Sequence, residues 1–351
     1  MSNEHDSLPL VSVIITSYNR EKYISETINS VLLQDYKNLE IVISDNASTD
    51  NTDLLIRKYL HDKKIKYFRN ESNIGMIANF KLATERANGK YITYLSSDDY
   101  FINNSFISES VSLINKYNNV LLVLGRYTRF YEDTKKTEID QGGIFNKQFI
   151  KGNDLFLQFP HIKTVSWAAA LMHRETFLGL NPFEKPCTAM DVLSNLKLML
   201  LGNVALINKA SYMHRIHDGI ASLGINIEQA IDNFIYITEP YNTALENSII
   251  PKKKLDKWKT DSAFLYARSI SVQFAPQSKT DYHRFIAYVK ANFPGVYQKL
   301  RLNFKWNILI FFFKRPALSL KFLNIVSKDH YMYLKHLIDN GNNRLFEKVK
   351  L

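Results

Sequence analysis

The sequence predicts an α/β fold in which helices cover both faces of a mostly parallel sheet, followed by a helical C-terminal extension. β-Branched runs and segments with helical spacing alternate over the first hundred residues. This order requires crossover connections between strands, which produce parallel sheets. The chain has 351 residues, of which 46% are hydrophobic, so it can bury a large core. Beyond residue 225 the pattern is mainly helical.

The first half of the fold is predicted element by element. Residues 11–16 form a short β-branched run, typical of a buried parallel strand. Apolar residues then recur at helical spacing between Tyr23 and Leu32. Further strands are predicted at 39–44, 65–68 and 91–95, and further helices at 55–60 and 76–87.

The rest of the chain has a more mixed pattern. The predicted elements are a helix at 105–117, a strand at 120–131, a polar loop at 133–143, a strand at 167–172, a helix at 191–201 and a strand at 204–215. The predicted helices beyond 225 are separated by turns near Pro251, Pro276, Pro294 and Pro316. We divide the chain into a first domain at 1–225, with halves at 1–104 and 105–225, and a C-terminal region at 226–351.

Composition and charge limit the class of protein. Cys187 is the single cysteine, so no intrachain disulfide can form, and a reducing compartment fits best. The first ten residues lack the apolar stretch of a secretory signal. The longest strongly apolar run, at 308–313, is far shorter than the ~20 residues of a membrane-spanning helix. These features favour a cytoplasmic protein.

The net charge of +11 is concentrated near the C-terminus. Residues 251–351 contain 20 Lys and Arg but only 6 Asp and Glu, whereas the preceding residues contain 25 and 28. Aromatic residues alternate with these basic residues, as in helices that lie on an anionic membrane surface. The alternative is a helical subdomain that packs its aromatic residues inward or forms a homo-oligomer. No nucleic-acid-binding module is recognised.

Polar residues follow the predicted strands, where parallel sheets bind their ligands. A nucleoside diphosphate needs a wall for its base, an acceptor for a base N–H, and a hard divalent cation for its phosphates. Tyr18 could supply the wall, Asp45 the acceptor, and Asp98 and Asp99 the metal ligands. Each of these residues alone could be an ordinary turn or cap residue. Together, at consecutive strand ends, they favour a nucleotide site.

Three segments carry a family resemblance: VSVIITSYNR at 11–20, SDNASTD at 44–50 and YLSSDDY at 94–100. They resemble the inverting glycosyltransferase family 2, and the resemblance extends over about residues 9–220. It implies the GT-A fold, whose sheet is Rossmann-like, with a nucleotide-binding half at 1–104 and an acceptor-binding half at 105–225, and a nucleotide-diphosphate sugar donor. The type expected is the one that assembles bacterial polysaccharide, O-antigen or capsule.

The resemblance also implies roles for individual residues. The nucleotide-binding set that it implies is Thr16, Tyr18, Asn19, Arg20, Asp45 and Asp98. We add Asn73 to this set, because its polar loop precedes the third predicted helix. Asp98 and Asp99 are expected to hold Mn²⁺ or Mg²⁺, with Asp99 preferred as the direct ligand. This chain has Ser96 and Ser97 where many relatives carry an acidic residue.

Downstream residues complete the expected site. The family places a general base at the start of a helix, where Asp191 stands here, and Met190 replaces the usual Glu. Asp191 could alternatively be a simple N-terminal helix Asp. His217 is the candidate third metal ligand, and its imidazole suits Mn²⁺ better than Mg²⁺. Arg215 is expected to help hold the diphosphate.

The expected reaction moves a sugar from a UDP- or dTDP-sugar to a saccharide hydroxyl by a single displacement. A basic, aromatic C-terminal region suggests a lipid-linked acceptor and a peripheral position on the inner face of the cytoplasmic membrane. One alternative is a sugar-1-phosphate nucleotidyltransferase, but residues 16–20 lack the glycine that a triphosphate loop needs. Another is a non-catalytic nucleotide-sugar or membrane-binding module. Dinucleotide-binding and P-loop glycine motifs are absent from the sequence.

Overall fold

The computed structural model describes residues 8–139, 143–159, 161–162, 167, 169–185, 187–217 and 225–303. The chain divides into two compact units. The first contains residues 1–217 and 232–259, and the second contains residues 218–231 and 260–351. The two units are described separately below.

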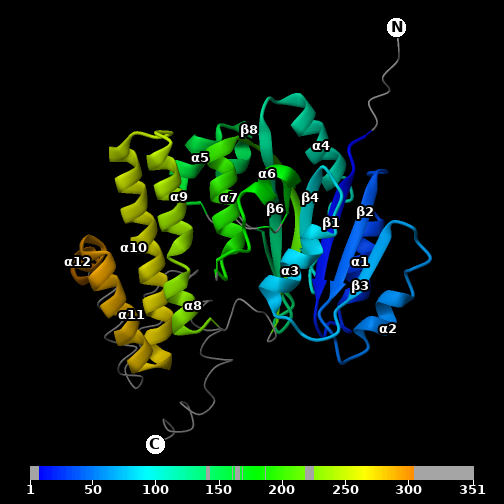
Figure 1. The fold of residues 1–351 in the computed structure, drawn as a ribbon, viewed down its shortest axis with the longest axis horizontal. Helices are drawn as coiled ribbons and strands as arrows, with labels where there is room; N and C mark the ends of the chain where they lie inside the picture. Colours follow the sequence, from blue (N-terminus) through cyan, green and yellow to red (C-terminus); the bar gives the residue numbers. More distant parts are fainter. Residues whose placement is uncertain are drawn as a thin grey trace, which may run out of the picture. The chain divides into compact units, whose positions relative to one another are not determined.

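The first half of the first unit is a parallel sheet in the order β3-β2-β1-β4 (Figure 1). Its strands are β1 (Val11–Ser17), β2 (Leu39–Asp45), β3 (Ile65–Arg69) and β4 (Tyr91–Ser96). The helices that connect them are α1 (Ile24–Leu32), α2 (Thr52–Arg57) and α3 (Met76–Glu85). Every residue of β2 is buried, including the charged Glu40 and Asp45, because helices cover both faces of such a sheet.

The second half of this sheet is mixed. β9 (Ala170–His173) pairs antiparallel with both β4 and β6 (Val120–Tyr131), and β6 pairs parallel with β10 (Asn203–Ile216). Short strands complete the sheet: β5 (Tyr100–Phe101), β7 (Lys136–Ile139) and β8 (Phe149–Ile150). The helical elements here are α4 (Phe106–Lys116), the 3₁₀ turn η1 (Gly143–Asn146), α5 (Gly152–Gln158), α6 (Arg174–Gly179) and α7 (Met190–Leu201).

The remaining elements are helical. They are α8 (Ile227–Asp232), α9 (Ile235–Glu246), α10 (Lys252–Gln277), α11 (Lys279–Asn292) and α12 (Pro294–Leu302). Ser278 caps α11 by accepting the backbone N–H of Asp281, and Pro294 starts α12, where its missing N–H costs nothing. Among the described residues, no helix has the length and hydropathy needed to cross a membrane.

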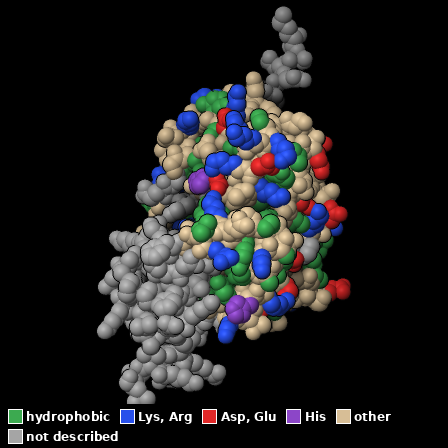
Figure 2. Space-filling view, turned by 90° about the vertical axis from the view of Figure 1, so that its left-hand side faces the viewer, with side chains coloured by type: hydrophobic (Ala, Val, Ile, Leu, Met, Phe, Trp, Pro, Cys, Tyr) green, Lys and Arg blue, Asp and Glu red, His purple; other side chains and the backbone are tan. Residues whose placement is uncertain are grey.

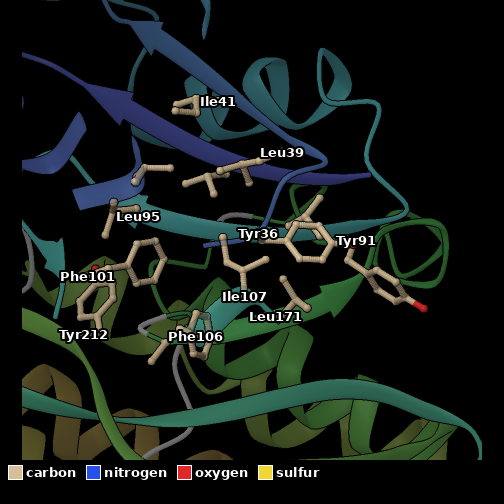
Figure 3. Packing of buried hydrophobic residues seen from close by; sticks show 14 of the residues in the cluster. Tyr36, Leu39, Ile41, Tyr91, Leu95, Phe101, Phe106, Ile107, Leu171 and Tyr212 are labelled. Carbon is tan, nitrogen blue, oxygen red and sulfur yellow. The ribbon is translucent and has the colours of Figure 1, made fainter. Parts of the chain in front are cut away.

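The core of the sheet half lies between the strands, α1 and α4. Figure 3 shows Leu95, Phe101, Phe106 and Ile107 directed toward one another. The rings of Phe101 and Phe106 stack with centroids 5.5 Å apart, and Tyr212 of β10 meets Phe101 edge-on at 6.1 Å. This packing fixes β5 and β10 beside the end of β4, where the predicted site residues lie.

The predicted α/β fold with a helical C-terminal region is confirmed, and most predicted elements are present. The loop predicted at 133–143 was wrong in part, because β7 pairs with β6 through exposed polar residues that lack an apolar pattern. The prediction also missed β5, β8, α5 and α6, which are short. The predicted turn near Pro316, the apolar run at 308–313 and the last part of the C-terminal region lie outside the described residues.

Candidate active site

The register of the parallel strands brings three predicted segments to one edge of the sheet. Thr16, near the end of β1, stands level with Ser44 of β2 on one side and Ser96 of β4 on the other. The residues that follow these positions therefore leave the sheet together. At the far side of β4, β10 pairs with β5 through Tyr212 and Met213, so the segment that ends in His217 also reaches this edge.

Asp98 connects two of these segments. Its Oδ2 lies 3.2 Å from Nε of Arg20, after β1, and 3.1 Å from Nε2 of His217, after β10. Burial alone would raise the pKa of Asp98, but the hydrogen bond to His217 and the charge of Arg20 outweigh it and lower the pKa. Asp98 is therefore held as a carboxylate with two cationic or proton-donating neighbours.

Asp99 faces the protein instead. It is 2% exposed, and its oxygens accept hydrogen bonds from the hydroxyl of Tyr212 at 2.6 Å and the backbone N–H of Arg215 at 2.7 Å. Nδ1 of His214 lies 3.2 Å from the same carboxylate. Burial opposes the charged form of His214, but the hydrogen bond to Asp99 outweighs it and raises the pKa. To bind a metal directly, Asp99 would have to exchange one of these protein donors, and its preference over Asp98 as the direct ligand stays a prediction.

Arg215 is also engaged within the protein. Its Nε donates to the backbone carbonyl of Asp98 at 2.9 Å, and its other nitrogens lie 2.6 Å from Glu26 and 3.5 Å from Glu132. Three aromatic rings surround the guanidinium, those of Tyr23, Tyr100 and Phe130. Arg215 is 8% exposed and these groups surround it, so its contact with a diphosphate stays a prediction. Arg215 fixes the turn that carries Asp98.

Several residues that support this site were not predicted. The ring of Tyr23 packs against His217 with centroids 4.9 Å apart, and its hydroxyl donates to Glu132 at 2.9 Å. Tyr212 and His214 hold Asp99, as described above. The last two stand in the same short segment as Arg215 and His217, so spacing could have indicated them. Glu132 follows β6, and no motif around it indicates that it belongs to the site.

Asp45 lies beneath its own loop. It is fully buried and accepts hydrogen bonds from the backbone N–H and the hydroxyl of Ser48, and Nε of Arg69 lies 3.3 Å from its Oδ2. The hydroxyl of Tyr67 is 3.4 Å from the same oxygen. To accept a base N–H, Asp45 would have to exchange one of these partners. As placed, it shapes the loop after β2.

Tyr18 and Asn19 differ in exposure and role. The side chain of Tyr18 is 41% exposed, so its ring is available to pack against a flat ligand. Asn19 adopts a positive φ of 52° and links the loops after β1 and β2. Its backbone N–H donates to Ser48 at 2.9 Å, and its side-chain oxygen accepts the backbone N–H of Thr49 at 2.8 Å.

A partly buried hydrogen-bond network around Asn46 holds the loop before α3. Asn46 donates to Oδ1 of Asn73 at 2.8 Å and accepts the backbone N–H of Ile74 at 3.0 Å. Gly75, with φ of 84°, donates its N–H to the same oxygen of Asn73. Asn73 is exposed, and its loop is joined through Asn46 to the segment after β2. Its contact with a ligand stays a prediction.

Asp191 stands in the first turn of α7 in a different environment. Burial raises the pKa of Asp191 to about 6, although backbone N–H groups, including those of Val192 and Trp167, act in the opposite direction. The indole N–H of Trp167 donates to the hydroxyl of Ser194 at 3.0 Å, and that hydroxyl donates to the carbonyl of Asp191. The Trp167 ring stacks on Tyr94 of β4 at 4.1 Å, which links Asp191 to the strand that precedes Asp98.

The predicted metal set of Asp98, Asp99 and His217 is not assembled as three converging ligands. Within the described ranges, no group of three or more His, Cys, Asp or Glu side chains is arranged to hold a metal ion. Asp98 and His217 remain as a carboxylate oxygen and an imidazole nitrogen that face one another. Because Mg²⁺ and related ions in phosphate sites take one or two protein ligands together with phosphate oxygens and water, these two residues fit such an ion.

Comparison with known proteins identifies the family. The model of "Glycosyl transferase family 2" matches residues 12–179. A Haemophilus influenzae protein described as an uncharacterized glycosyltransferase is 34% identical over 178 residues, which cover 46% of this chain and 70% of that protein. The chain belongs to glycosyltransferase family 2. It is therefore a transferase, and the family resemblance of its strand-end motifs is confirmed.

Other relatives match shorter parts. The Escherichia coli enzyme WfgD, named as a UDP-Glc:α-D-GlcNAc-diphosphoundecaprenol β-1,3-glucosyltransferase, is 38% identical over 118 residues, 34% of this chain and 46% of that enzyme. The chain spans half of a second H. influenzae relative and 22% of a Rickettsia conorii one.

Among solved structures, TarS of S. aureus in complex with UDP has a TM-score of 0.63 and 21% identity, covering 87% of this chain and 89% of that one. The similarity confirms the GT-A type of fold with a helical C-terminal region.

Proposed function

We propose that this glycosyltransferase moves a sugar from a UDP- or dTDP-sugar to a saccharide hydroxyl by a single, metal-assisted displacement that inverts the anomeric carbon. The observation that carries the proposal is the convergence of Arg20, Asp98 and His217 from three separate segments at the carboxyl edge of the sheet. Parallel sheets bind their ligands at this edge. UDP in the TarS complex and UDP-Glc in the name of WfgD support a uridine nucleotide donor.

The nucleotide would lie across the loops after β1, β2 and β3. Tyr18 offers an exposed ring for the base, with Thr16 at the end of β1 and Asn73 on the opposite loop. Asn19 and Asp45 hold these loops through Ser48, so their role is to shape the site. Arg20 stands at the phosphate end, because its guanidinium already lies against Asp98.

Asp98 and His217 would hold Mn²⁺ or Mg²⁺ together with the diphosphate. When bound, such an ion neutralises the charge that develops on the leaving diphosphate. Arg20 acts in the same direction with a fixed positive charge. Tyr23 packs against His217 and Arg215 bonds the carbonyl of Asp98, so both residues fix the orientation of this pair before the donor arrives.

Asp191 is the proposed general base. In the displacement, the acceptor oxygen forms a bond to the anomeric carbon while the bond from that carbon to the diphosphate oxygen breaks. The carboxylate of Asp191 takes the proton that the acceptor hydroxyl loses. A pKa of about 6 suits this task, because the group is mostly ionised at neutral pH and yet basic enough to accept a proton.

The acceptor is proposed to be a sugar of a bacterial surface polysaccharide, carried on a membrane lipid. WfgD and the Bacillus subtilis protein TuaG, named as a putative teichuronic acid biosynthesis glycosyltransferase, support this assignment. We assign the protein to the cytoplasmic face of the membrane, with the basic C-terminal region on anionic lipid. Exposed lysines at 252–254 begin α10. Figure 2 shows Lys and Arg side chains scattered among hydrophobic ones on the face it displays.

The decisive experiment is a screen of UDP- and dTDP-sugars by thermal shift and by slow donor hydrolysis, with Mn²⁺, with Mg²⁺ and with a chelator. We expect stabilisation by a uridine or thymidine nucleotide sugar that depends on the metal. Equal stabilisation with and without metal would contradict the metal-assisted mechanism. Indifference to every nucleotide sugar would contradict the proposed donor class.

A further inference from the structure

A small pocket opens beside α7, away from the residues that hold Asp98. It lies between the loop that follows α6, the middle of α7 and Glu239 of α9, and all of its lining residues belong to the first compact unit. Its volume is about 200 Å³. Pockets for drug-sized ligands usually measure about 300–1,000 Å³, so this one suits a single ring rather than a nucleotide or an oligosaccharide.

The walls of the pocket combine apolar surface with a compact ionic group. Leu180, Pro182 and Leu193 supply the apolar part. In the ionic group, Glu239 is bonded by Lys185 and lies 2.8 Å from Nζ of Lys197. Burial alone would raise the pKa of Glu239, but the two lysines outweigh it and lower the pKa, so this carboxylate is ionised at neutral pH.

The charges of the lining balance. Lys185 and Lys197 carry positive charges, and Glu239 and Glu184 carry negative ones. A charged ligand would therefore meet one group of its own sign for each group of the opposite sign. A neutral ligand with several hydroxyls can donate to the carboxylate of Glu239 and accept from both lysines, while its C–H face packs on the apolar wall. A monosaccharide ring has this chemistry.

The pocket adjoins the proposed base through α7. Ser194 lines the pocket and stands three residues after Asp191, and residues three apart lie about 5–6 Å from one another on a helix surface. The hydroxyl of Ser194 also donates to the carbonyl of Asp191 at 3.1 Å. A ring held against Ser194 would thus lie about one helical turn along α7 from Asp191, whose carboxyl takes the acceptor proton.

We propose that this pocket, between the loop after α6 and helices α7 and α9, binds a neutral monosaccharide ring of the acceptor. The inference rests on the proposed function, because it takes Asp191 as the general base. Lys185, Lys197 and Glu239 then determine which acceptor hydroxyls are recognised. This assigns acceptor specificity to a part of the chain after residue 179, outside the segment that the family model matches.

The test measures sugar and nucleotide binding separately on the full chain. Methyl α- and β-glycosides of glucose, galactose, mannose and N-acetylglucosamine are titrated by ligand-observed NMR at saturating UDP and Mn²⁺. The variants are Glu239→Gln and the more exposed Lys185→Gln, each compared with Glu246→Gln, an exposed glutamate on the same helix. Circular dichroism checks that each variant is folded, and UDP affinity is measured in parallel.

We expect at least one glycoside to bind the wild type and the Glu246 control. Its affinity should fall by about tenfold or more in the Glu239 and Lys185 variants, because each loses a charged hydrogen-bond partner. UDP affinity should not change. Equal glycoside binding in all variants, or no glycoside binding to a wild type that binds UDP, would overturn the inference alone. A wild type that does not bind UDP would instead overturn the proposed function.

Discussion

The turn after β4 and the start of α7 each present a carboxylate, but the protein treats the two groups in opposite ways. Asp98 lies against Arg20 and His217, and its pKa is lowered. The hydrogen-bond partners of Asp191 are backbone N–H groups, and burial raises its pKa to about 6. The first environment favours a permanently ionised group that binds cations, and the second favours a group that exchanges protons near neutrality.

The difference teaches that position at a strand or helix end does not assign a role to an Asp. Asp98 and Asp99 are adjacent in sequence, yet only Asp98 faces the residues of other loops, while Asp99 is bonded to β10. The partners of each carboxylate decide between cation binding, proton transfer and structural support.

The largest effect is expected for Asp191→Asn. The amide keeps the shape and the backbone hydrogen bonds but cannot take a proton, so kcat should fall by about 10²–10⁴-fold. UDP affinity should stay within about twofold, measured by calorimetry. Asp154→Asn, an exposed first-turn Asp of α5, is the matched control and should keep full turnover. A mutant with near wild-type turnover would remove Asp191 from the mechanism.

Asp98→Asn should impair metal-dependent nucleotide binding and leave proton transfer by Asp191 unaffected. Losing the negative charge should weaken metal-dependent UDP binding by at least about 10–100-fold. The loss of kcat/KM at acidic pH should still occur near pH 6, because Asp191 is unchanged. Titration of Mn²⁺ at fixed UDP provides the measurement, with the exposed Asp133→Asn as control. Unchanged metal dependence would show that Asp98 is not a ligand.

The pH dependence should report Asp191. Its pKa is raised in the folded protein, so the ionised base is lost as the pH falls through about 6. Below that value, kcat/KM should fall about tenfold per pH unit. The same shift means that ionisation at higher pH opposes folding, so Asp191→Asn should melt no lower than the wild type at pH 7.5. An acid limb that persists unchanged in the residual activity of Asp191→Asn would contradict the assignment.

The smallest effect is expected for Ser194→Ala. The change removes the hydroxyl that joins the indole N–H of Trp167 to the carbonyl of Asp191. We expect a loss of about 1 kcal/mol in the free energy of unfolding, measured by urea titration. Metal-dependent UDP binding should not change, because Asp98 has no contact with this group. Weaker UDP binding would show that the two regions are coupled.

Much of the fold could be predicted because its signals are local. The β-branched run at the start of β1, the helical spacing of α1 and the apolar run at 120–125 in β6 each indicate their element within a dozen residues. Short elements such as β5 and α6 were not predicted, because two to six residues are too few to show a period. β7 was not predicted because both of its faces are exposed and polar.

For the site, the sequence identified the right segments but not every role within them. Arg20, Asp98 and His217 do come together, whereas Arg215 and Asp99, predicted to contact the diphosphate and its metal, are held by Glu26, Glu132 and Tyr212. Two of these three partners, Glu26 and Tyr212, are more than a hundred residues away along the chain. Spacing along the chain cannot show which of two neighbouring carboxylates will accept hydrogen bonds from such distant groups.

The sequence by itself determined the family, the α/β order and the segments at the edge of the sheet, because these depend on local pattern and on residue types that chemistry requires. Only the tertiary structure decided that Asp98 is paired with cationic neighbours and that Asp99 accepts hydrogen bonds from β10. It also decided that the pKa of Asp191 is raised toward neutral pH. Burial and long-range partners set the energy of a charge, and both exist only once distant parts of the chain have packed together.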